Sequence, residues 1–122
     1  MKQKEIKWLP EPEEKDYPAA ASYLNLIFDD TTVKEMELKL KKVNMTTFKA
    51  KDVLRASSLT LLGISNAHVT ADIKKIKSKK LLSPILLVRN TANGKLIIAD
   101  GYHRLCAVYA VDEDAIIPCK II

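Results

Sequence analysis

The chain has 122 residues and a formal net charge of +5, with 48% hydrophobic and 29% charged residues. These values are ordinary for one globular domain with a single core. The longest apolar run, residues 81–88, contains Ser83 and Pro84 and is too short to cross a bilayer, and the charged N-terminus has no signal-peptide core. We therefore expect one cytoplasmic domain over residues 1–122, with no membrane partner.

Basic residues are concentrated in the middle of the chain. Residues 31–80 hold twelve basic and four acidic residues, whereas residues 1–30 are acidic and residues 81–122 are balanced. Such an excess can steer an anionic partner, a nucleotide or a nucleic acid, or can simply form solvated lysine-rich helix faces. Cys106 and Cys119 lack the spacing of metal ligands, and two cysteines do not make a disulfide framework. We expect both to be buried, reduced thiols.

The N-terminal half is predicted to be an arm followed by helices. Residues 1–16 are polar and contain Pro10 and Pro12, which favours an extended arm that packs through Trp8 and Leu9. The helices that follow have amphipathic spacing, and the stretches around Thr46-Thr47 and at 57–65 read as a turn or cap and a loop. The expected helices are 17–28, a second one capped by Asp30 or Thr31 with Val33, Met36, Leu40 and Val43 facing inward, and 50–56.

The C-terminal half alternates helices and strands. Asn66 is a good N-cap for a helix to about Lys79, and Asn93-Gly94 is a hairpin turn between two apolar strands. Pro118 is expected to push the last strand toward a sheet edge or a bulge. The predicted elements are strands 84–88 and 95–99, a helix at 102–111 and a strand at 115–122. The fold class is α/β (α+β): a small mixed sheet with helices around it, a helical portion at 17–65 and a core at 66–122.

The strand-to-helix junction at Asp100-Gly101 is the strongest candidate for a site. Gly101 permits a sharp turn, and the first turn of the following helix exposes amide N–H groups at the positive end of its dipole. With His103 and Arg104 alongside, this arrangement suits an anion such as a phosphate. The alternative is structural: Asp100 is then only the N-cap or the partner of Arg104, and Tyr102 only fills the cleft.

The sequence Asp100-Gly101-Tyr102-His103-Arg104, between a buried strand and an amphipathic helix, resembles the ParB and sulfiredoxin superfamily over about residues 66–122. The Gly-Cys-His-Arg motif of sulfiredoxins matches Gly101, His103 and Arg104, and in that family it binds ATP phosphates. Tyr102 stands in place of the catalytic cysteine, so sulfinic acid reduction is not expected, and Cys106 should face the core. ParB-like free serine kinases carry a similar Asp-Gly-His-Thr-Arg motif, which implies that Asp100 assists attack by a substrate hydroxyl.

The resemblance also implies a second wall for the site. By spacing from Pro84, Thr70 and Lys74 on the preceding helix are the residues expected to meet a nucleotide. His68 lies on the same stretch and reads more simply as a surface or capping residue; two histidines do not make a catalytic zinc site. The implied ligand is a nucleoside triphosphate with Mg²⁺.

Two functions remain open. The first is a nucleotide- or phosphate-binding protein, with a small-molecule phosphotransferase as its enzymatic form, that uses Asp100 to Arg104. The second is a DNA-binding or regulatory module without catalytic activity. Residues 50–79 can be read as helix–turn–helix with a lysine-rich second helix, although the connection at 57–65 is longer than usual.

Overall fold

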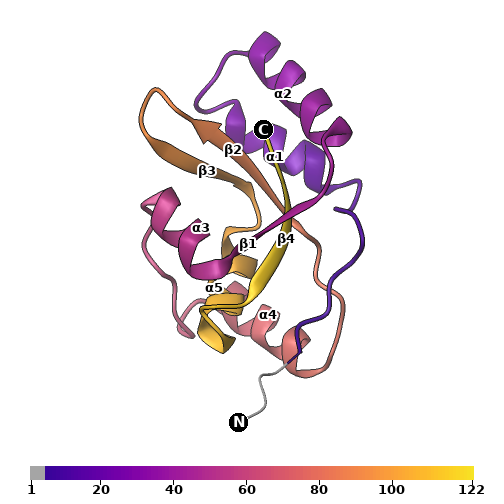
Figure 1. Cartoon of the computed structure of the whole chain (residues 1–122), viewed down its shortest axis with the longest axis vertical. Helices are drawn as coiled ribbons and strands as arrows, with labels where there is room; N and C mark the ends of the chain where they lie inside the picture. The colour runs from indigo at the N-terminus through magenta and orange to yellow at the C-terminus, as the bar shows by residue number, and fades with distance from the viewer. Residues whose placement is uncertain (1–4) are drawn as a thin grey trace.

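A computed structural model describes residues 5–122, and Figure 1 shows its arrangement. The elements are α1 (Asp16–Leu24), α2 (Asp30–Lys42), β1 (Thr46–Lys49), α3 (Ala50–Ser57), α4 (Ala67–Lys77), β2 (Ile85–Asn90), β3 (Lys95–Asp100), α5 (Tyr102–Val111) and β4 (Ile116–Ile121). The four strands form one sheet in the order β1-β4-β2-β3, in which β2 and β4 are parallel and the other two pairs are antiparallel. The expected α+β class with a small mixed sheet is confirmed.

Helices cover both faces of this sheet because the central strand β2 is apolar on both sides. Side chains alternate between the faces of a strand. Ile85 and Leu87 face one layer, and Leu86 and Val88 face the other; all four are buried. The first layer is formed by α3, α4 and α5, and the second by α1 and α2. The apolar run of β2 therefore holds two helical layers together.

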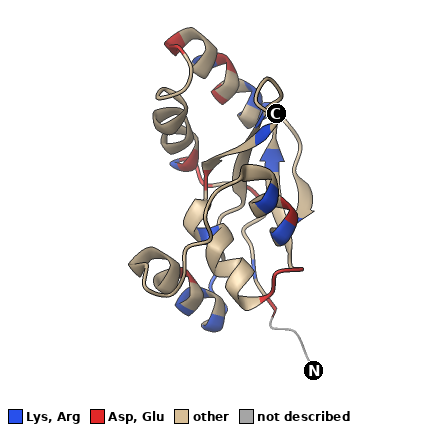
Figure 2. Cartoon of the chain, turned by 90° about the vertical axis from the view of Figure 1, so that its left-hand side faces the viewer, with Lys and Arg blue, Asp and Glu red and all other residues tan. Residues whose placement is uncertain are grey.

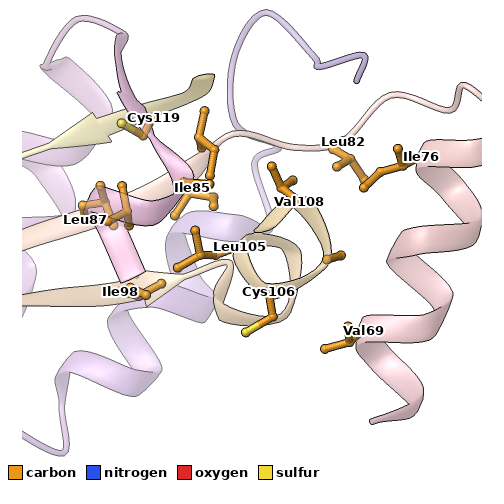
Figure 3. Close-up of a cluster of buried hydrophobic side chains, with 14 residues drawn as sticks. Val69, Ile76, Leu82, Ile85, Leu87, Ile98, Leu105, Cys106, Val108 and Cys119 are labelled. Carbon is orange, nitrogen blue, oxygen red and sulfur yellow. The ribbon is translucent and has the colours of Figure 1, made fainter. Parts of the chain in front are cut away.

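The larger core lies between the sheet and α5. Figure 3 shows Ile85 and Leu87 from β2 near Leu105 of α5, and Val69 and Ile76 on α4 on the far side of α5. Leu105, Cys106, Ala107 and Val108 are all fully buried. Helix α5 is thus the central helix of this layer, with the sheet on one side and α4 on the other. Its first turn is consequently fixed in place by packing.

The N-terminal arm packs as predicted. Trp8 forms a bridge to Leu82, and the amide of Leu9 donates to the carbonyl of Leu82 at 2.8 Å. Lys120 in β4 is 3% exposed and connects the sheet to α2 and to the arm. Its Nζ donates to the carbonyl of Lys41 at 2.9 Å and lies 3.4 Å from a carboxylate oxygen of Glu11. The part of the arm at residues 1–4 lies outside the described residues.

Two predictions about the strands were wrong. Thr46-Thr47 opens β1 rather than forming a turn or cap, because a four-residue strand is too short to show periodicity. β4 is central rather than at an edge. Pro118 is tolerated there because β2 pairs with β4 only from Cys119 onward, so the missing N–H of Pro118 falls outside that ladder.

The cap of α2 was also predicted wrongly, since Asp29 and not Asp30 or Thr31 is its N-cap and accepts from the amide of Thr32 at 2.8 Å. The Asn66 cap of α4 is confirmed, with bonds from the amides of His68 and Val69. Both cysteines are buried free thiols, as expected, and burial raises the pKa of Cys119 to about 11. None of the helices in residues 5–122 has the length and apolar character needed to span a bilayer.

Candidate functional site

The chain turns sharply between β3 and α5, as predicted. Gly101 has φ of 110° and ψ of 18°, a backbone conformation that a side chain rarely adopts. The space around it is also closed: a Cβ at this position would lie 2.8 Å from Cγ1 of Ile85. The turn brings Asp100, at the end of β3, close to the first residues of α5, and all of them line the same pocket. The glycine is therefore required both for its conformation and for its lack of a side chain.

The start of α5 has no side-chain cap. Gly101 itself is the N-cap residue, and the first bond of the helix runs from the amide of Leu105 to the carbonyl of Gly101 at 2.9 Å. Within residues 5–122 the amides of Tyr102, His103 and Arg104 make no hydrogen bond. Three N–H donors at the positive end of the helix dipole are thus available to an external anion or to water.

Asp100 is not the N-cap that the sequence suggested, because its carboxylate is engaged elsewhere. Oδ2 of Asp100 accepts from Nη2 of Arg104 at 3.0 Å, and both side chains are less than one fifth exposed. Burial raises the pKa of Asp100 above its ordinary value of 3.8, although the guanidinium of Arg104 opposes this shift. The pair explains why a cation is tolerated in the first turn of a helix. It also means that Asp100 neutralises most of the charge Arg104 could offer a ligand.

The second wall of the site is α4, as predicted, but through another face of that helix. His68, Ala71, Asp72 and Lys75 line the hollow at the start of α5. These positions have the three-and-four spacing that places residues on one side of a helix. The predicted contacts Thr70 and Lys74 do not line it: the hydroxyl of Thr70 donates to the carbonyl of Ile64 at 2.6 Å. The lysine that lines the hollow is Lys75, one residue further along.

Together the two helices enclose a polar pocket of about 280 Å³. Besides the α4 residues it is lined by Asp100 and by all four residues from Gly101 to Arg104 that the sequence singled out. The rings of His68 and His103 lie 4.8 Å apart, centroid to centroid, so one histidine from each helix packs against the other in the wall of the pocket. The ring of Tyr102 stacks on His103 at 5.8 Å.

Tyr102 has a structural contact as well. Its hydroxyl donates to the carbonyl of Thr60, in the segment that joins α3 to α4. The amide of Leu62, in the same segment, lies 3.5 Å from Sγ of Cys106. Tyr102 therefore both lines the pocket and fastens the connecting segment to α5. Cys106 faces the core, as the resemblance to sulfiredoxins implied for this chain.

Sequence reasoning missed Asp72 and Lys75, which lie 3.8 Å apart between carboxylate oxygen and Nζ. The sequence contained a signal for both residues, because helical spacing from His68 leads to positions 71, 72 and 75. Counting back from Pro84 was less accurate, because it required the length of the irregular segment between α4 and β2. Residues 5–122 contain no group of three or more histidine, cysteine, aspartate and glutamate side chains placed to hold a metal ion.

Comparisons of the chain with protein-family models, with curated proteins and with solved structures give no match.

Proposed function

We propose that this protein binds a phosphate-bearing small molecule, in the first place a nucleotide, at the start of α5, as a ParB-like domain of the cytoplasm. The observation that carries the proposal is the uncapped helix start: the amides of Tyr102, His103 and Arg104 make no hydrogen bond within residues 5–122, and these three residues line a polar pocket. Phosphate oxygens are the acceptors best suited to such a site, since they are multiple and negatively charged.

The side chains around the amides support the same ligand. His68, His103 and Lys75 line the pocket, and each side chain can donate a hydrogen bond to a phosphate oxygen. Arg104 serves this site mainly as a positioning residue. Its Nη2 donates to Asp100, and within residues 5–122 its Nε is buried without a hydrogen-bond partner.

A nucleoside triphosphate with Mg²⁺ fits these residues. Magnesium on substrate phosphates commonly takes only one or two protein carboxylates, and Asp72 would supply one from the pocket wall. The enzymatic form of the proposal is phosphoryl transfer. An alcohol oxygen attacks the terminal phosphorus, the bond to the bridging oxygen breaks, and the hydroxyl proton passes to the carboxylate of Asp100.

Calorimetric titration with ATP, ADP, CTP and GTP, each with and without Mg²⁺, tests the binding. The matched pair Lys75→Gln and Lys74→Gln removes the same charge from adjacent positions, only one of which lines the pocket. We expect Lys75→Gln to weaken binding by about threefold to fivefold, the value of one partly exposed ion pair, and Lys74→Gln to change it by less than about twofold. No heat with any nucleotide, or equal losses in the two variants, would contradict the proposal.

A nucleic acid is the second candidate, and the exposed lysines at the end of α4 favour it. Lys74, Lys75 and Lys77 lie in the last turn of that helix, and Figure 2 shows this basic segment at one end of the molecule. The arrangement of helices does not favour helix–turn–helix, since α4 packs on α5 and α3 on α5 and β3. DNA binding that weakens steeply with salt and is lost equally in Lys74→Gln and Lys75→Gln would support this candidate over the first.

A further inference from the structure

A second pocket lies at the opposite end of the β2–β3 hairpin from the nucleotide site. It has a volume of about 370 Å³ and lies between α3 and the tip of the hairpin, whose positions Figure 1 shows. Its apolar lining comes from four elements: Phe48 in β1, Val53 in α3, Leu96 in β3 and Ile121 in β4. The volume is within the range of about 300–1,000 Å³ typical of small-molecule sites.

This pocket continues the main core. Val53 is 3% exposed and belongs to the buried cluster between the sheet and α5, and Leu96 and Ile121 pack against that cluster. Ala56, on the last turn of α3, has the smallest of the side chains that α3 contributes to the wall, and it leaves the space beside Val53 unfilled. A hydrocarbon group entering here would extend an existing apolar core, so its burial is favourable.

The rim of the pocket is positively charged. Arg89 is paired with Leu96 across the hairpin and lies on the same face of β2 as Ile85 and Leu87. Within residues 5–122 its guanidinium makes no ion pair and no side-chain hydrogen bond, and Lys95 beside it has no ion pair either. The one acidic residue on the rim, Asp52, already accepts from Arg55 at 3.4 Å. The rim therefore favours a negative group.

We propose that this pocket binds a small apolar carboxylic acid, with its hydrocarbon part against Val53, Leu96 and Ile121 and its carboxylate at Arg89. A planar guanidinium with free donors matches a carboxylate in two parallel hydrogen bonds. The apolar lining supplies affinity and Arg89 supplies selectivity for the acid. This site is independent of the nucleotide site proposed above, since the two pockets share no residue.

Titrations with hexanoate, octanoate and decanoate, all below the concentrations at which they form micelles, test the proposal by calorimetry and by amide chemical shifts. We expect the affinity to rise by about fourfold for each added CH₂ until the pocket is full. Decanol should bind about fivefold more weakly than decanoate, the value of one charge-assisted pair. The largest shift changes should be at Val53, Leu96 and Ile121.

Two variants separate the parts of the proposal, and two more serve as controls. Arg89→Gln should reduce decanoate binding to the level of decanol and leave decanol binding unchanged. Ala56→Trp places a large side chain in the pocket from an exposed position and should abolish binding of both ligands. Lys34→Gln, at an exposed position on α2, removes the same charge as Arg89→Gln and should have no effect on binding. Lys75→Gln, which tests the nucleotide site, should also leave decanoate binding unchanged.

Several results would overturn the proposal. Undiminished decanoate binding in Ala56→Trp would mean that the ligand lies elsewhere. Equal affinity for decanoate and decanol, with no effect of Arg89→Gln, would show that the site does not recognise a carboxylate. Self-association of the wild type that is lost in Ala56→Trp, without binding of any acid, would assign this face to a second copy of the chain.

Discussion

Replacement of Gly101 by alanine is the sharpest test of the turn that positions the candidate site. The added Cβ would lie 2.8 Å from Cγ1 and 3.2 Å from Cγ2 of Ile85, and 3.0 Å from Nη2 of Arg104. Ile85 is fully buried in the central strand, and Arg104 is held by Asp100. Neither neighbour can move away without disturbing the core or the ion pair.

Two costs add in this variant. A side chain at a positive φ costs about 1–2 kcal/mol, and overpacking of a closed core costs about 1–3 kcal/mol more. We therefore expect Gly101→Ala to lower the free energy of unfolding by about 2–5 kcal/mol, which corresponds to a fall of about 10 °C or more in Tm. Urea denaturation followed by circular dichroism measures it, with an unchanged slope as the check that both states remain comparable.

The other two glycines of the chain are matched controls. Gly94 has φ of 65° but nothing within 4 Å of its missing Cβ, so Gly94→Ala should cost only the conformational term of about 1–2 kcal/mol. Gly63 has neither a positive φ nor a close neighbour, and Gly63→Ala should be neutral or stabilising by up to about 1 kcal/mol. A loss in Gly101→Ala no greater than in Gly94→Ala would refute the steric part of this reasoning.

Three further predictions concern the side chains of Lys120, Asp100 and Tyr102. Lys120→Met leaves the carbonyl of Lys41 without its buried donor and should cost about 1–3 kcal/mol by urea denaturation; an unchanged midpoint would contradict the role given to this lysine. Burial raises the pKa of folded Asp100 above 3.8, so its contribution to stability is greatest below that pH and is lost as pH rises through the folded value. The stability of the wild type relative to Asp100→Asn should therefore fall with rising pH in this window, and a rise would show that Arg104 outweighs burial. Tyr102→Phe removes the bond to Thr60, and faster hydrogen exchange at residues 59–62 with little change in α5 is the expected result.

The sequence predicted the junction well because several local signals agree there. The apolar strand, the glycine and the amphipathic spacing after Leu105 each indicate the same change from strand to helix, and α5 begins at Tyr102 as expected. The hairpin at Asn93-Gly94 and the cap at Asn66 depend on short-range chemistry and were equally accessible. Each of these features is specified by residues within a few positions of one another.

What could not be predicted depends on contacts between distant segments. The central place of β4 follows from its pairing with β1 and β2, and no pattern near Pro118 encodes those partners. The sequence allowed Asp100 either to cap α5 or to pair with Arg104. In the structure one helical turn separates the two residues, and Asp100 pairs with Arg104. The face of α4 that meets α5 depends on the length of the segment between α4 and β2, and for this reason the spacing from Pro84 pointed to Lys74, whereas Lys75 lines the pocket.

An amide chemical-shift titration of ¹⁵N-labelled protein with ATP and with inorganic phosphate shows whether the start of α5 receives a phosphate group. We expect saturable changes that are largest at Tyr102, His103 and Arg104, followed by His68 and Lys75 in the wall formed by α4. Changes confined to the exposed lysines of α4, growing without saturation and absent from the first turn of α5, would contradict it.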